Sequence, residues 1–256
     1  MKYSLSKLVT ALFCFAILST TVVQAQDPQQ YQASVYGFMG SDPHVTPWGN
    51  NMGRSFDIPA SKGGEDYILL SNPDYADGLG LEIQIRTQVN DHWSFVRAVG
   101  IRIGDETFEI EASASDYTAA PRYWANGKEH DTADTITSFA SNVVAADMLP
   151  LNSKQYRFEA DLSIFEGDKI VVETFGPYCR VDMYTYGSFD SHSGLLGTFP
   201  QGIKLGRDES TIFGDDDGEA FAQEWKVVPA QDGTLFHATA ATSARSSNSR
   251  LSRASA

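Results

Sequence analysis

The strongest constraint on the fold is a strict alternation of apolar and polar residues along several short stretches of the chain. In LEIQIRTQV, which begins at Leu81, the residues Leu81, Ile83 and Ile85 share one face, and charged or amide side chains take the other. The stretches AVGIRIG, YRFEADLSIF and DKIVVETF repeat this pattern. Because side chains of an extended strand point alternately to opposite sides, a period of two predicts strands with one buried face.

Turn signals separate these stretches at short intervals. Gly104-Asp105 follows AVGIRI, and Asn126-Gly127 lies in YWANGKEH, and such pairs favour tight hairpins. Long stretches with the helical period are missing from the sequence. AADMLPL, residues 145–151, predicts one helical turn, and EAFAQEW, residues 219–225, predicts a short helix. The whole pattern predicts one all-β domain, an antiparallel β-sandwich with a short C-terminal helix.

The first residues have the pattern of a secretory signal peptide. Lys2 and Lys7 precede an apolar run over residues 8–18, and Val23-Gln24-Ala25 supplies small residues for processing. The run is shorter than the roughly 20 residues of a transmembrane helix, although an uncleaved anchor is the alternative. Since no later segment is long and apolar enough, the sequence predicts no membrane span and a secreted protein, extracellular or associated with a cell wall.

The chain divides into four parts by composition. Residues 1–25 are the predicted signal peptide, residues 26–34 an N-terminal extension, and residues 35–238 the folded domain. Residues 239–256 are rich in Ser, Ala and Arg and contain few large apolar side chains. Such a segment buries too little surface to offset the entropy of ordering, so the sequence predicts a disordered tail.

The charge of the chain limits its partners. Removal of Lys2 and Lys7 with the signal peptide changes the formal charge from −14 to −16, and the three Arg of the tail leave −19 on residues 26–238. An acidic body repels nucleic acid and anionic lipid, so the sequence excludes nucleic acid as a partner.

The cysteines exclude a disulfide framework. Cys14 lies in the signal peptide, so Cys179 has no intrachain partner in the mature protein. Cys179 alternates in phase with Val181 and Met183, which predicts a thiol on the buried face of a strand.

Motifs of common enzymes are missing from the sequence. It contains no HExxH, no paired CxxC and no GxSxG. Ser191, His192 and Ser193 are adjacent, but neighbours in an extended strand face opposite sides, so adjacency does not make a Ser–His pair. The sequence therefore predicts that the protein is not an enzyme.

The stretch SDPHVTPWGNN contains one chemically fragile bond. The carboxyl group of Asp42 can attack its own carbonyl carbon, and the nitrogen of Pro43 leaves more readily once it is protonated. His44 can supply that proton near its pKa. Asp42, Pro43 and His44 are therefore candidates for self-cleavage. The structural alternative is that Pro43 fixes a turn, His44 makes a buried hydrogen bond and Asp42 caps local amides.

Two separated stretches resemble one family. SDPHVTPWGNNMGRSFDIPASKGGEDYILLSNPD, residues 41–74, and GLLGTFPQGIKLGRDESTIFGDDDGEAFAQEWKV, residues 194–227, are similar to the opening and closing parts of the von Willebrand factor type D domain. The resemblance covers roughly residues 35–228 and points to cysteine-poor, single-domain secreted members.

The resemblance implies a β-sandwich of the von Willebrand type D kind that works by binding or assembly. Such a module acts in matrix, cell-wall or adhesive material, and its partner is an extracellular protein or a glycan. Two alternatives come with the family. Some relatives cleave themselves at the equivalent of Asp42–Pro43, and others belong to lipid-transfer proteins, which implies a carrier of lipid or another small ligand.

Calcium is the cofactor that the resemblance implies, but this chain departs from the family's ligand pattern. The family's Asn in Gly-Asn-Phe is Thr198 here, and residues 200–204 carry no acid. Asp208, Asp215 and Asp217 are the candidate substitute ligands. An EF-hand does not fit these acids, because placing Gly218 at its sixth position puts Phe213 at the first ligand position.

The signal peptide gives the first testable prediction. We expect the secreted protein to begin at Gln26, because Val23-Gln24-Ala25 is the processing site. N-terminal sequencing of material recovered outside the cell measures this directly. A chain that starts at Met1 would contradict the extracellular assignment.

Overall fold

The computed structural model describes residues 30–36, 42–49, 54–59, 64–90, 93–113, 120–130, 145–152, 155–162, 167–187, 192–229 and 231–236. The predicted signal peptide and the predicted disordered tail lie outside these residues. In the described part of the chain, no helix combines the length and the apolar character of a membrane-spanning segment.

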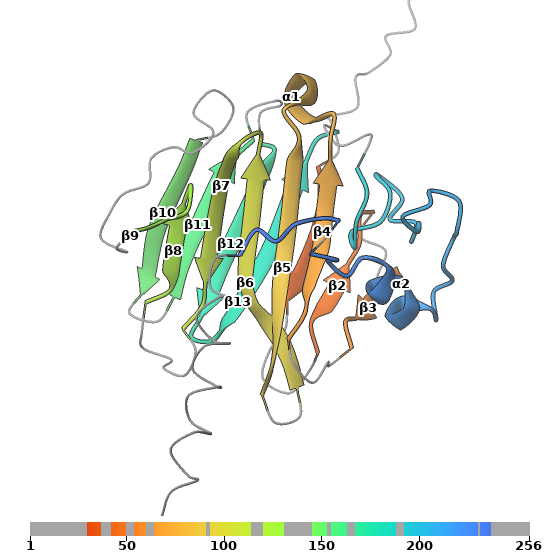
Figure 1. The fold of residues 1–256 in the computed structure, drawn as a ribbon, viewed down its shortest axis with the longest axis horizontal. Helices are drawn as coiled ribbons and strands as arrows, with labels where there is room; N and C mark the ends of the chain where they lie inside the picture. The colour runs from red at the N-terminus through yellow and green to blue at the C-terminus, as the bar shows by residue number, and fades with distance from the viewer. Residues whose placement is uncertain are drawn as a thin grey trace, which may run out of the picture.

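The described residues form strands and two short helices (Figure 1). In chain order they are β1 Tyr31–Tyr36, β2 His44–Thr46, β3 Phe56–Asp57, β4 Asp66–Asn72, α1 Tyr75–Gly78, β5 Leu81–Asn90, β6 Trp93–Ile103, β7 Glu106–Glu111, β8 Arg122–Ala125, β9 Lys128–His130, β10 Ala145–Asn152, β11 Gln155–Asp161, β12 Lys169–Phe175, β13 Tyr178–Thr185 and α2 Gly218–Glu224.

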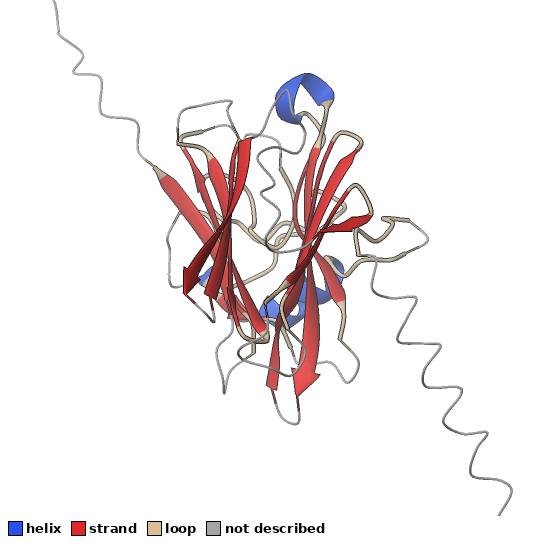
Figure 2. Cartoon of the chain, turned by 90° about the vertical axis from the view of Figure 1, so that its left-hand side faces the viewer, coloured by secondary structure: helices blue, strands red, loops and turns tan. Residues whose placement is uncertain are grey.

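Two antiparallel sheets pack face to face, which confirms the predicted all-β sandwich (Figure 2). Within the described residues, one sheet has the order β10-β11-β12-β13-β1-β2-β3 and the other β4-β5-β6-β7-β8-β9. The predicted hairpin turns are present, since Gly104 and Asp105 join β6 to β7 and Asn126 and Gly127 join β8 to β9. The predicted short helix near the end is α2.

The interior is built from the alternating residues of both sheets. Ile83 and Ile101 face each other across β5 and β6 and are fully buried. Phe108 of β7 stacks on Phe158 of β11, with ring centroids 4.1 Å apart, so aromatic rings join the two sheets directly. Burial of this apolar surface is the main force that holds the sandwich together.

The outer edge of β4 is closed by two segments from the end of the chain. Ser71 and Ser193 exchange two backbone hydrogen bonds of 2.8 Å, and the N–H of Leu195 donates to the carbonyl of Ile68 at 3.1 Å. Further along the same edge, the N–H of Ile68 donates to Trp225 at 2.9 Å. These bonds satisfy backbone groups that an open edge would leave unpaired.

The same closure reaches the other sheet. The N–H of Trp48, two residues after β2, donates to the carbonyl of Leu196 at 3.2 Å. Gly194 fits this junction because it has a φ of +127° and because a Cβ there would lie 2.6 Å from the carbonyl oxygen of Leu69. The two stretches that resemble the family opening and closing therefore lie side by side.

A third segment covers the outer face of the second sheet. The N–H of Leu235 donates to Gln84 Oε1 at 3.1 Å, and the Phe236 ring lies under the guanidinium of Arg86, 4.4 Å from its centre. In Figure 1 this dark blue segment crosses in front of β5 and β6. Gly100 of β6 leaves the room that Leu235 occupies.

Two expectations from the sequence differ from the structure. Residues 145–151 form part of the edge strand β10 rather than a helical turn, because they pair with β11 from Ala145 opposite Asp161 onward. Strand β1 begins at Tyr31 and pairs with β13, so residues 31–34 belong to the sheet although the sequence placed them in an N-terminal extension. In both cases pairing with a distant strand decides the conformation.

Trp225 tests the packing of this junction. Its side chain is 5% exposed, its indole N–H donates to the carbonyl of Leu205 at 3.1 Å, and the Arg207 guanidinium lies over its ring. We expect Trp225→Ala to lower the free energy of unfolding by about 3–5 kcal/mol, measured by chemical denaturation. Ile212→Ala is the control, because Ile212 is 69% exposed and should change stability by less than about 0.5 kcal/mol. A loss below about 1 kcal/mol for Trp225→Ala would place the indole outside the core.

Candidate functional site

Asp42 joins the two sheets. Its Oδ1 accepts hydrogen bonds from the backbone N–H of Ser94 at 3.1 Å and from the Ser94 hydroxyl at 3.0 Å. Ser94 is a buried residue of β6, whereas Asp42 lies two residues before the first residue of β2. The carboxylate is therefore held by a partner in the opposite sheet, 52 positions away in sequence.

His44 faces a different partner. Its Nδ1 lies 2.9 Å from Asp57 Oδ1, across the pairing of β2 with β3, and both side chains are partly exposed. Pro43, between them in sequence, is buried, and its carbonyl accepts the N–H of Ile58 at 2.8 Å. The Asp42 carboxyl, Pro43 and the His44 imidazole are each fixed by a separate contact. Together these contacts hold β2 against β3 and β6, an arrangement that we call the clamp.

Asp42→Ala distinguishes a clamp from a cleavage site. We expect the variant to lose about 1–3 kcal/mol of unfolding free energy, because two buried donors of Ser94 lose their acceptor. Asp74→Ala is the control, since the exposed Asp74 makes no capping hydrogen bond with its side chain.

We also expect the purified wild-type chain to keep its intact mass for days at mildly acidic pH. Spontaneous appearance of a fragment that begins at Pro43 would show instead that the bond is a self-cleavage site.

The three candidate calcium ligands have separate roles. Asp208 accepts from the backbone N–H groups of Ser210 and Thr211 and from both hydroxyls, at 2.7–3.0 Å. These hydrogen bonds hold the pKa of Asp208 well below its usual range. Asp217 Oδ2 accepts the N–H of Gly214 at 2.9 Å. The backbone carbonyl of Asp215 accepts an N–H of the Lys204 ammonium at 2.9 Å.

These contacts do not fit a calcium ion. Calcium takes six to eight oxygen ligands around one centre. Here the carboxylate oxygens of Asp208 accept hydrogen bonds from its own turn, and the backbone carbonyl of Asp215 accepts a hydrogen bond from Lys204. Among the described residues, no group of three or more His, Cys, Asp or Glu side chains is arranged to hold a metal.

Cys179 is buried, as its alternation predicts. It is 1% exposed, and its thiol donates to the carbonyl of Arg97 at 3.4 Å. Burial raises the pKa of the thiol to about 12. The side chain is therefore a packing group of the core and carries no thiolate at neutral pH.

His192 lies in an aromatic cluster. Its ring packs edge-on against Trp48, with centroids 5.6 Å apart, and at 6.2 Å from Phe199. Ser191, which the sequence places next to it, lies outside the described residues. Ser193 uses its backbone to pair with Ser71 at the β4 edge.

An open cleft lies at the junction of the two family-like stretches. It encloses about 430 Å³ and is lined by His192, Thr198, Phe199, Leu205 and Glu209 among others. The Phe199 ring packs edge-on against Trp48 at 5.6 Å, which fixes its position. This volume lies in the range of about 300–1,000 Å³ that is typical of small-ligand sites.

Glu209, which lines the same cleft, has an uncommon backbone conformation. Its φ is +57°, which is uncommon for a residue other than glycine, and its side chain is exposed. The turn that holds it is closed by the N–H of Glu209 donating to Gly206 at 3.0 Å and by the bonds of Asp208. Strain of this kind concentrates at functional sites, although it does not identify a function by itself.

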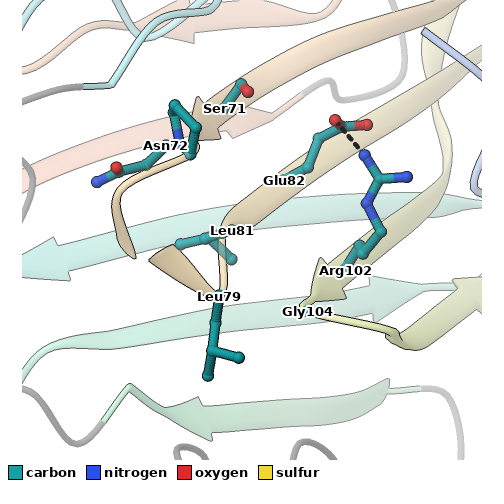
Figure 3. Close-up of a pocket in the computed structure, with 9 residues that line it drawn as sticks. Ser71, Asn72, Leu79, Leu81, Glu82, Arg102 and Gly104 are labelled. Atoms are coloured by element: carbon teal, nitrogen blue, oxygen red, sulfur yellow. Dashed lines mark hydrogen bonds and ion pairs between the residues drawn. The ribbon is translucent and has the colours of Figure 1, made fainter. Parts of the chain in front are cut away.

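A second, more polar pocket of about 290 Å³ lies at the ends of β4, β5 and β6 (Figure 3). Glu82 Oε2 and Arg102 Nη2 form an ion pair at 2.7 Å on its wall. Leu79, another residue that lines the pocket, is half-exposed. Because Glu82 and Arg102 neutralise each other, this pocket offers less free charge to a ligand than the cleft with Glu209 does.

No protein-family model matches the chain, and a search of curated proteins finds no match either. Sequence reasoning missed Lys204, Phe199 and Glu209, which the fold brings to this region. The signal for Lys204 was present as a basic residue that precedes a run of acids, whereas the positive φ of Glu209 has no signal in composition or spacing.

Proposed function

We propose that the chain is a secreted binding or assembly module of the von Willebrand type D kind, in extracellular matrix, cell wall or adhesive material. The observation that carries this proposal is the junction at the edge of β4. There residues 193–196 and 225–227 pair with the strand that the opening stretch supplies, and Trp48 joins Leu196. The two stretches that resemble the family thus support each other as one structural unit.

A non-catalytic role agrees with the contacts of the reactive side chains. Asp42 is held by Ser94, His44 faces Asp57, and the Cys179 thiol is buried. General acid–base or nucleophilic catalysis needs such groups within reach of one another and of a substrate. In the described part of the chain they serve instead as links between strands.

The cleft with Phe199 and Glu209 is the binding surface that we assign to the module. An aromatic ring offers an apolar platform, while Glu209 and Thr198 offer oxygen atoms to donors of a partner. The acidic body disfavours a strongly anionic partner. An uncharged glycan or a basic or neutral segment of an extracellular protein fits these groups.

The alternatives receive less support. Self-processing at Asp42–Pro43 would need the carboxyl and the imidazole at one peptide bond, and their contacts hold them to different strands. A lipid carrier would need an apolar cavity, whereas Phe108 and Phe158 stack directly on each other between the two sheets.

Glu209→Gln tests the assigned surface. We expect the wild-type chain from Gln26 to bind selected members of a glycan array or a panel of matrix proteins, measured by biolayer interferometry. The variant should bind about tenfold more weakly, because glutamine keeps an acceptor oxygen but loses the negative charge that strengthens the hydrogen bond from the partner. Glu219→Gln, on the exposed face of α2, is the matched control and should leave binding unchanged.

Two results would contradict the proposal. Binding that Glu209→Gln leaves intact would remove the cleft from the binding surface. Release of shortened glycans or peptides from the same panel, detected by mass spectrometry, would show an enzyme instead of a binding module.

A further inference from the structure

Lys204 is a buried cation inside the acidic end of the domain. Its side chain is 2% exposed, although lysine is almost always found at the surface. The ammonium donates to the backbone carbonyl of Asp215 at 2.9 Å and to that of Gly214 at 3.3 Å. It also lies 5.2 Å from the centre of the Phe56 ring, over its face.

The charges around Lys204 explain why a buried ammonium is tolerated. Asp215, Asp216 and Asp217 favour its charged form, whereas burial, the largest influence, and Arg54 oppose it. Burial lowers the pKa of Lys204 from its ordinary value, which the three acids partly counteract. A charge that is removed from water is stable only when hydrogen bonds and opposite charges surround it, and here both are present.

Lys204 lies where three pieces of the fold meet. Its carbonyl accepts the N–H of Phe213 at 2.9 Å, so its backbone forms the base of the 205–212 loop. Its ammonium fixes Gly214 and Asp215 just before α2, whose first residue, Gly218, packs against Phe56 of β3. One residue, through its backbone and its side chain, therefore ties the loop, the start of α2 and β3 together.

The groups that Lys204 holds are those that a hard metal ion would use. Backbone carbonyl and carboxylate oxygens are the usual ligands of calcium. In this chain the two carbonyls accept hydrogen bonds from the ammonium, and Asp217 Oδ2 accepts the N–H of Gly214. The attraction that orders these oxygens thus comes from a cation that is covalently part of the chain.

We propose that the Lys204 ammonium is an internal cation that orders residues 205–217 in place of a divalent metal, so that this end of the domain folds without calcium. The inference does not depend on the proposed binding role, because it concerns the stability of the loop and not its partner. It predicts that the module keeps its fold when the concentration of calcium around it changes.

The first experiment compares the thermal unfolding of the wild-type chain from Gln26 in excess EDTA and in millimolar calcium chloride at equal ionic strength. We expect the two Tm values to agree. A calcium site with a Kd one hundredth of the calcium concentration would raise Tm by about 5–10 °C, and a saturable rise of that kind would overturn the proposal.

The second experiment removes the charge and keeps most of the length of the side chain. Lys204→Met should lower Tm by about 5 °C or more and should speed amide hydrogen exchange in residues 205–217 before the rest of the sandwich. Lys128→Met, on the exposed strand β9, is the control and should change neither measurement. If Lys204→Met is as stable and as protected as the wild type, the charge has no such role and the proposal fails. If the variant does not fold, the calcium comparison on the wild type still decides.

Discussion

The backbone pairing along the outer edge of β4 is the contact on which the rest of the structure depends. Ser71 with Ser193 and Ile68 with Trp225 satisfy donors and acceptors that a bare edge strand would expose. Because Leu196 also accepts the N–H of Trp48, the same segment fastens the second sheet to the strand that follows Asp42. A sandwich without disulfides in its described residues benefits from such ties, since its two sheets otherwise hold together mainly through the packing of side chains.

The candidate sites follow from this closure. After residues 193–196 pair with β4, the chain next hydrogen-bonds to β4 at Trp225, so residues 197–224 form an excursion outside the two sheets. Phe199 and Phe221 of this excursion pack against Tyr31 of β1 and Phe56 of β3. The cleft with Glu209, the Lys204 cluster and α2 all lie on this excursion. The exposed side chains of this segment, Glu209 among them, can change at little cost to the sandwich, and binding residues are commonly found on loops that a rigid scaffold positions.

The sequence predicted the parts of the fold that depend on local pattern. Alternation identified β5, β6, β11 and β12, and turn residues identified two hairpins, because both signals arise from near neighbours. It failed for residues 145–151, where pairing with β11 overrode a weak helical signal, and for Tyr31, whose strand is set by β13. The contacts of Asp42 with Ser94 and of Lys204 with Asp215 could not be predicted, because each depends on how separate segments meet. The acidic run and Lys204 were both visible in the sequence, but the contact between them was not.

A lysine and a metal ion can each supply the positive charge that orders a group of carbonyl and carboxylate oxygens. They differ in how far their contribution depends on the solution around the protein. A bound ion stabilises a fold by mass action, so its contribution falls as the free ion becomes scarce. An ammonium attached to the backbone cannot dissociate, although it must be removed from water, and the carbonyls of Gly214 and Asp215 and the Phe56 ring offset that cost. In the extracellular role proposed above, an acidic protein would meet ionic conditions that it does not control. An internal cation keeps the cleft-bearing excursion in one conformation under those conditions, whereas a calcium-dependent loop would couple partner binding to the calcium level.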